Sequence, residues 1–191
     1  MLTLAFIPLA VGINLGIGAI VQILKLPIFL DSIGTIITAL LLGWRAGAIV
    51  GVISFLITSL TIFGPAIYFS GTQVCIALFV YFSGKKSGFK NILRTTGTGI
   101  ILSILAAFIS APVIYYVFGG ITGNGISALT IYLQTTGLSK SQSVIISGLS
   151  AEFIDKTTQC LIAFTILKSI PQVLLSKFHG GCLKENNFIT Q

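Results

Sequence analysis

Residues 97–118 read GTGIILSILAAFISAPVIYYVF, a run without a charged side chain. A helix needs about 20 predominantly apolar residues to cross the hydrocarbon core of a bilayer, and this run has that length. The composition agrees, because 11 Lys or Arg and 4 Asp or Glu stand against 54% hydrophobic residues and a mean hydropathy of +1.04. A soluble domain is about a quarter charged. We therefore expect an integral membrane protein.

Five further apolar segments accompany this one, and the six predict an all-α integral membrane protein. They span about 2–24, 32–42, 46–63, 66–82, 97–118 and 143–167. Six transmembrane helices would form one compact bundle over residues 1–191, with a short cytoplasmic tail at about 169–191. The second segment is short for a span, so a single re-entrant unit with the third, and five spans in all, is the alternative. The first segment has no basic region before it, and we expect no signal peptide.

Lysine and arginine placement predicts the orientation of the bundle. With the N-terminus inside, the inner connections and tail hold Arg45, Lys85, Lys86, Lys90, Arg94, Lys168, Lys177 and Lys184. The outer connections hold Lys25 and Lys140. This bias predicts that both termini are cytoplasmic. The net charge of +7 is then mostly a topology signal, and no solvated basic face is expected for nucleic acid.

The chain lacks the sequence motifs of most membrane enzymes. It contains no Walker loop, no HExxH and no GxSxG. Cys75, Cys160 and Cys182 are widely spaced and the one histidine, His179, lies in the tail, so neither a disulfide framework nor a metal site is expected. We expect a protein that is not an enzyme and has no cofactor, and any energy source must come from another chain or an ion gradient.

The last apolar segment is exceptional because it carries charges well inside it, in the run SAEFIDKTTQC at residues 150–160. Glu152, Lys156 and Gln159 are spaced i, i+4 and i+7 and share one helical face, and Asp155 lies beside that face. At about 1.5 Å per residue, Glu152 would lie roughly 13 Å into the membrane. Charges at that depth cost about 2.5–3.5 kcal/mol each. They should therefore face the bundle interior and be paired.

This charged segment has two interpretations. In the first, Glu152 and Lys156 neutralise each other and only hold helices together. In the second, Glu152, Asp155 and Gln159 form hydrogen bonds with a polar solute in the outer half of the bundle, and Lys156 keeps the carboxylates ionised. Further groups that could complete such a pocket are Asn14, Gln22, Thr35, Tyr68, Thr72, Gln73, Tyr115, Tyr116 and Phe118, of which the aromatic ones could instead anchor their helices at the membrane boundary.

Two outer connections could close the pocket. After Lys25, Pro27 breaks the helix and the run before Asp31 is too short to cross, so this loop should fold back and deliver Asp31 to the mouth of the bundle. Alternatively, Asp31 only caps the next helix. The glycine-rich connection 118–142, which contains Asn124, predicts a flexible outer lid with some ordered turns.

Two pairs of glycines have the small-xxx-small spacing that lets helices approach closely. Gly12 and Gly16 lie in the first segment, and Gly47 and Gly51 lie in the third. Each pair could serve ordinary packing within the chain or a docking surface for a partner membrane subunit.

Several stretches resemble the substrate-binding S-components of energy-coupling factor (ECF) vitamin transporters. They are LPIFLDSIGT at 26–35, LLGWRAGAIVG at 41–51, APVIYYVFGGITG at 111–123 and FIDK at 153–156. The resemblance covers most of the chain. Members of that family often carry Ala-xxx-Ala on the first helix for docking, where this chain has Gly12 and Gly16.

The resemblance implies a subunit in the bacterial plasma membrane that captures a water-soluble B-vitamin or precursor from outside. It would work with a transmembrane coupling subunit and two cytoplasmic ATPase subunits. A small planar heterocycle such as pyridoxine, hydroxymethylpyrimidine or thiamine would suit the polar and aromatic groups. The candidate solute-binding residues are Asp31, Tyr68, Tyr116, Asn124, Glu152, Asp155, Lys156 and Gln159, with Gly12 and Gly16 for docking.

Two other classes of protein compete with this reading. A membrane-embedded sensory or signalling domain has a similar composition, but an output domain normally follows it. A self-sufficient secondary carrier usually has inverted repeats, and the sequence shows no such symmetry.

Overall fold

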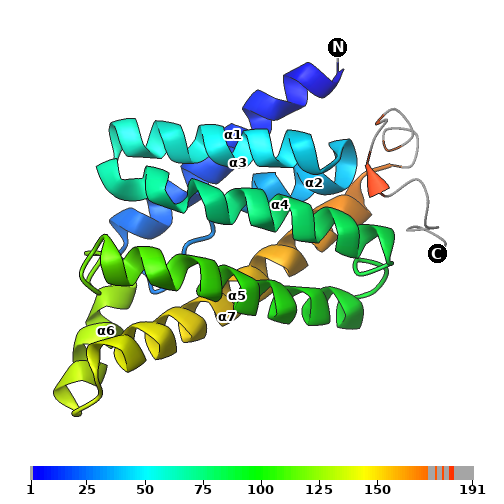
Figure 1. The fold of residues 1–191 in the computed structure, drawn as a ribbon. Coiled ribbons are helices and arrows are strands. Elements are labelled where there is room, and N and C mark those ends of the chain that lie inside the picture. Colours follow the sequence, from blue (N-terminus) through cyan, green and yellow to red (C-terminus); the bar gives the residue numbers. More distant parts are fainter. Residues whose placement is uncertain (1, 172–174, 176–177, 179–180, 183–191) are drawn as a thin grey trace.

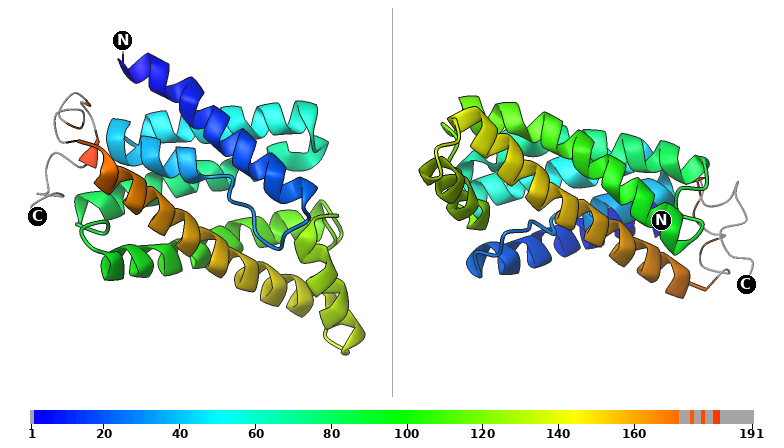
Figure 2. Two further views of the ribbon diagram at one scale, coloured as in Figure 1. Left: turned by 180° about the vertical axis from the view of Figure 1, so that it is seen from behind. Right: turned by 90° about the horizontal axis from the view of Figure 1, so that it is seen from below.

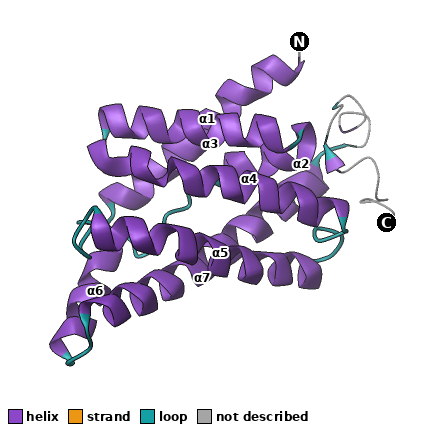
Figure 3. Cartoon of the chain, viewed as in Figure 1, coloured by secondary structure: helices purple, strands orange, loops and turns teal. Residues whose placement is uncertain are grey.

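The computed structural model describes residues 2–171, 175, 178, 181 and 182, and over these residues the protein is all-α (Figure 1). The elements are α1 Leu2–Ile23, α2 Ile33–Leu42, α3 Trp44–Thr61, η1 Gly64–Phe69, α4 Ser70–Lys85, α5 Ile92–Tyr116, α6 Gly125–Thr135 and α7 Lys140–Ser169. Figure 3 shows these helices joined by short loops, except for the longer connections between α1 and α2 and between α5 and α6. The helix predicted in each of the six apolar segments is confirmed.

The main departure from the sequence prediction lies between α5 and α7, where a flexible lid was expected. The 11-residue helix α6 occupies part of this connection. Gly119, Gly120 and Gly123 have positive φ angles that turn the chain after α5. The Asn124 side chain then accepts a hydrogen bond from the backbone N–H of Ile126 and caps the new helix.

Helix α2 lies in the centre of the bundle, in contact with α1, α3, α4 and α7. Every residue of α2 from Ile33 to Leu41 is buried. Its ten residues span about 15 Å, roughly half of a bilayer core. In the irregular segment that precedes it, residues 28–32 are half-buried or buried in the bundle, whereas residues 24–27 are exposed. This agrees with the expectation that the loop folds back.

Glycines allow the close helix contacts around α2. A Cβ atom on Gly34 would collide with the carbonyl oxygen of Ala10 on α1. A Cβ on Gly47 would lie 2.8 Å from the Cβ of Ala39, so the third-segment glycines serve packing within the chain. Gly12 and Gly16 differ, because a Cβ on either would meet no atom within 4 Å. They lie on the exposed face of α1.

The connections alternate between two ends of the bundle (Figures 1 and 2). One end holds the start of α1, the α2–α3 junction, the 85–91 connection and the end of α7. The other end holds the 24–32 loop, the α3–η1 turn and α6. We call these the basic end and the loop end, because Arg45, Lys85, Lys86, Lys90, Arg94 and Lys168 lie at the first.

Length, composition and surface indicate a membrane bundle. Four stretches of helix are long and apolar enough to cross a membrane: Ala5–Ile23, Trp44–Thr61, Gly64–Lys85 and Ile92–Tyr116. Large apolar side chains also point outward, among them Leu93, Phe108 and Ile154. A water-facing surface rarely carries so many exposed apolar side chains together.

The predicted tail at 169–191 lies mostly outside the described residues, including Lys177, His179 and Lys184. Two of its described residues pack on the bundle. The Phe178 ring contacts the Phe6 ring of α1 at 5.6 Å, and the Cys182 thiol lies 3.7 Å from the carbonyl oxygen of Leu40. The chain after α7 thus returns to the core at the basic end.

Candidate functional site

A cavity of about 240 Å³ lies toward the loop end of the bundle, between α1, α3, α4, α5 and α7. The 24–32 loop and the start of α6 close it. Its volume is somewhat below the range of about 300–1,000 Å³ that is typical of small-molecule sites. Its polar lining residues are Asn14, Gln22, Asp31, Ser54, Thr58, Thr72, Gln73, Ser110, Thr122, Asn124, Glu152 and Lys156.

The charged side chains of this wall gather around the Lys156 ammonium group. Its Nζ atom lies 3.4 Å from Glu152 Oε2 and 3.9 Å from Asp31 Oδ1. A third carboxylate, that of Asp155, is closer at 2.5 Å. The prediction that the charges of the last helix face the interior and are paired is confirmed. Glu152, Asp155 and Lys156 are each less than 5% exposed.

Asp155 holds the 24–32 loop onto α7. One carboxylate oxygen accepts hydrogen bonds from the backbone N–H groups of Phe29 and Leu30, at 2.9 and 2.7 Å. The other oxygen accepts hydrogen bonds from Lys156 and Gln159. Leu30 has a φ of 49°, a left-handed conformation that costs a non-glycine residue about 1 kcal/mol or more. The two backbone contacts to Asp155 offset that cost.

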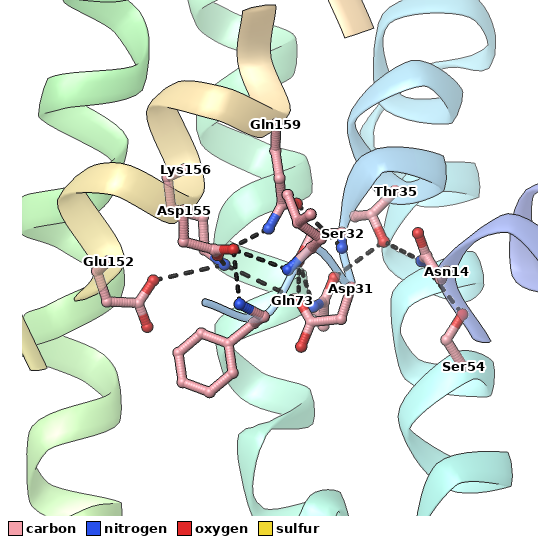
Figure 4. A network of polar contacts seen from close by, with 12 residues as sticks. Asn14, Asp31, Ser32, Thr35, Ser54, Gln73, Glu152, Asp155, Lys156 and Gln159 are labelled. Atoms are coloured by element: carbon pink, nitrogen blue, oxygen red, sulfur yellow. Dashed lines mark hydrogen bonds and ion pairs between the residues drawn. The ribbon is translucent and has the colours of Figure 1, made fainter. Parts of the chain in front are cut away.

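The same hydrogen-bond network continues from α7 to α1 (Figure 4). Gln159 accepts a hydrogen bond from the backbone N–H of Ser32 at 3.0 Å, and the Ser32 hydroxyl accepts one from Gln73 on α4 at 2.7 Å. Gln73 in turn accepts a hydrogen bond from Thr35, whose hydroxyl accepts one from Asn14 on α1. Buried amides and hydroxyls that are satisfied in this way fix the positions of several helices at once.

The alternative role for Asp31, as the cap of α2, is not what the structure shows. Ser32 occupies the cap position, and the Asp31 carboxylate accepts a hydrogen bond from the Ser32 hydroxyl at 2.8 Å. The Asn14 side chain supplies part of the missing cap, because its oxygen accepts a hydrogen bond from the backbone N–H of Gly34 at 2.7 Å. The Asp31 carboxylate therefore stays at the cavity wall, and its side chain is 25% exposed.

Aromatic rings form much of the apolar wall, and none of them is among the candidates that the sequence pattern suggested. The lining rings are Phe29, Phe55, Phe63 and Phe69. Phe118 stacks on both Phe63 and Phe69, with ring centroids 5.8 and 5.6 Å apart. Phe29 could have been predicted, because it lies two residues before Asp31 in a loop that is expected to fold inward.

The two loops that close the cavity touch each other. A Cβ on Gly125, the first residue of α6, would collide with the carbonyl oxygens of Lys25 and Leu26. The backbone of the 24–32 loop and the start of α6 can approach this closely because the residue is glycine. The connection that contains α6 thus meets the first loop over the cavity.

The structure places four of the eight predicted solute-binding residues in the cavity wall: Asp31, Asn124, Glu152 and Lys156. Asp155 and Gln159 lie behind the wall and are fully buried. Their polar atoms hold the 24–32 loop instead of facing the cavity. Tyr68 and Tyr116 point away and are 57% and 82% exposed, so their rings do not line the cavity. The membrane-anchoring interpretation suits these two tyrosines better.

The cavity wall offers charges, amides, hydroxyls and aromatic faces, and its lining residues include neither cysteine nor histidine. Such a surface can bind and orient a small polar solute by hydrogen bonds and stacking. No family model, curated protein or solved structure matches this chain. The geometry of the cavity is therefore the basis for the functional proposal.

Proposed function

We propose that this protein is the solute-capture subunit of an ECF-type importer. It binds a water-soluble B-vitamin or precursor of the size of pyridoxine, hydroxymethylpyrimidine or thiamine from the outside. A transmembrane coupling subunit and two cytoplasmic ATPase subunits then drive its release inward. The observation that carries this proposal is the cavity at the loop end, where carboxylates, amides and aromatic rings from distant segments meet.

In this proposal the chain crosses the bacterial plasma membrane six times, with both termini in the cytoplasm. The basic end then faces inward, in agreement with the distribution of Lys and Arg. The cavity faces outward, where a scarce solute is met first. Helix α2 and the 24–32 loop together make one crossing, so the short helix needs no lipid contact of its own.

Labelling of single cysteines tests this orientation. Thr136 at the loop end and Lys90 at the basic end are both exposed, whereas Cys160 and Cys182 are buried. We expect Thr136→Cys to react with a membrane-impermeant maleimide in intact cells, and Lys90→Cys to react only after lysis. The unsubstituted chain is the control for Cys75. Labelling of Lys90→Cys in intact cells, at the rate of Thr136→Cys, would contradict the orientation.

The exposed face of α1 is the proposed docking surface for the coupling subunit. Gly12 and Gly16 are exposed there and a Cβ on either would have free space, so a second helix could approach the α1 backbone closely. Neither glycine lines the cavity. Docking and solute binding therefore use different surfaces of the subunit.

Calorimetry on the purified protein in mild detergent tests the capture function. The panel is pyridoxine, hydroxymethylpyrimidine, thiamine and riboflavin, each titrated into the unmodified chain. We expect one of them to bind at a ratio of one to one, because the cavity holds a single small molecule. If none binds, and the protein also carries no solute from the cell, the sensory-domain interpretation replaces this one.

A further inference from the structure

The cavity has an excess of acidic groups. Three of the four acidic residues of the whole sequence, Asp31, Glu152 and Asp155, surround the single ammonium group of Lys156. Burial of a carboxylate without a compensating cation is strongly unfavourable. One lysine can compensate one of the three carboxylates in full. The other two need a further positive group or a proton.

The positive charge of Lys156 is directed mainly to Asp155. Their contact, at 2.5 Å, is shorter than the contacts of Lys156 with Glu152, at 3.4 Å, and with Asp31, at 3.9 Å. Asp155 is fully buried behind the wall, whereas Glu152 and Asp31 line the cavity. Figure 4 shows the Glu152 and Asp31 carboxylates on either side of the Lys156–Asp155 pair. The surface that a solute meets is therefore negative.

Two buried polar atoms at this cavity also lack hydrogen-bond partners among the described residues. Glu152 Oε2 forms no hydrogen bond with any described residue, although Lys156 is near it. The Thr72 hydroxyl, on α4, likewise has no hydrogen-bond partner within the described part of the chain, and Thr72 is only 7% exposed. Both residues line the cavity. Buried polar atoms are normally satisfied, so these two indicate hydrogen bonds that a ligand supplies.

The apolar part of the wall fits a flat ring beside this negative surface. Phe29 lies next to the charged cluster, with its ring centroid 5.8 Å from Lys156 Nζ. Phe55 and Phe69 line the cavity as well. Aromatic faces attract both planar rings and cations. The polar and apolar parts of the wall therefore both favour a planar solute with a positive charge.

We infer that the cavity takes a small planar solute that carries a positively charged hydrogen-bond donor, an amidinium, aminopyrimidinium or similar group. This donor approaches the Asp31 and Glu152 carboxylates from the cavity side, and the ring of the solute contacts the phenylalanine wall. The inference rests on the proposed capture function and narrows it to cationic solutes. It also assigns Lys156 to holding Asp155 rather than to binding an anion.

Three probes of the same shape and different charge test the inference: benzamidinium, benzamide and benzoate. Binding is measured by calorimetry on the full chain in neutral detergent. Benzamidinium should bind at least tenfold more tightly than benzamide, because its positive charge is attracted by both carboxylates and its two NH₂ groups can donate to each, whereas benzamide is neutral and has one NH₂ group. Benzoate should bind weakest, because it meets two carboxylates. Equal binding of the three, a preference for benzoate, or no binding of benzamidinium overturns the inference.

Variants of the cavity wall assign the preference to the carboxylates. Asp31→Asn and Glu152→Gln should each lower the affinity for benzamidinium about tenfold or more and lower the affinity for benzamide much less. Thr72→Val is the matched control, because it alters the wall without altering its charge. It should change the affinities for benzamidinium and benzamide by the same factor. If Glu152→Gln fails to fold, Asp31→Asn decides alone, since Asp31 lies in a loop and is partly exposed. A natural solute that is anionic, and that binds Asp31→Asn as tightly as the unmodified chain, overturns the inference while the capture function stands.

Discussion

Asp155→Asn is expected to destabilise the protein by about 3 kcal/mol, the low end of the cost of breaking a buried ion pair by removing one partner. The asparagine oxygen could still accept the hydrogen bonds from Phe29 and Leu30. Its NH₂ group would then face two donors, Lys156 Nζ and the Gln159 amide nitrogen. Rotating the Gln159 amide would only turn its NH₂ group toward the backbone N–H of Ser32. No arrangement of these amides satisfies every donor.

The matched control for this prediction is Glu152→Gln, which removes the same charge three residues away on the same helix. The Glu152 contact with Lys156 is a charge contact at 3.4 Å without a hydrogen bond, so its loss should change stability little. Loss of folded protein on heating in detergent, followed by fluorescence-detected size-exclusion chromatography, measures both variants. An Asp155→Asn protein as heat-resistant as Glu152→Gln would show that Asp155 does not hold the 24–32 loop.

Gly34→Ala is expected to destabilise the bundle by a similar amount, at the upper end of the 1–3 kcal/mol range of overpacked sites. The added methyl group would meet the carbonyl oxygen and carbon of Ala10 and the side-chain oxygen of Asn14. Two of these three atoms belong to the α1 backbone, which cannot rotate away as a side chain can. Helices α1 and α2 would have to separate, and the Asn14 hydrogen bonds to Gly34 and Thr35 would be lost.

Gly16→Ala is the matched control on α1. A Cβ there meets no atom within 4 Å, so the substitution should leave stability unchanged or raise it by up to about 1 kcal/mol through helix propensity. The temperature at which half of the protein remains folded, measured in one detergent for both variants, gives the comparison. Equal midpoints for Gly34→Ala and Gly16→Ala would mean that α1 and α2 do not approach as closely as described.

Much of the fold could be predicted from the sequence because the membrane imposes strict rules on helix length and charge. Long uncharged runs predict the positions of the helices, and the cost of placing a charge in lipid predicts that Glu152 and Lys156 point into the bundle. Helix α6 was missed because its short, mixed sequence follows several glycines. Its capping residue, Asn124, is a local signal that a helix begins there.

The site was predicted less completely, since its contacts join residues far apart in the chain. The bonds between Asp155 and the backbone of Phe29 and Leu30 connect positions more than 120 residues apart. Helical spacing places Asp155 beside the face of Glu152 but does not show that a loop supplies its partners. Tyr68 and Tyr116 are predicted site residues only because they are aromatic and near the outer boundary. Whether their rings face the cavity depends on how the helices pack, and the sequence pattern around these two tyrosines does not determine that.

Native mass spectrometry of the protein, purified in mild detergent from cells grown in rich medium, tests most directly whether the cavity holds a solute. We expect one bound molecule of the mass of a small vitamin or precursor. Glu152→Gln and Asp31→Asn proteins should lose it, while Gly16→Ala should keep it. The proposal that the cavity binds a solute would be contradicted by a protein that carries no bound molecule after growth in any medium. It would also be contradicted by a bound molecule that both cavity variants retain in full.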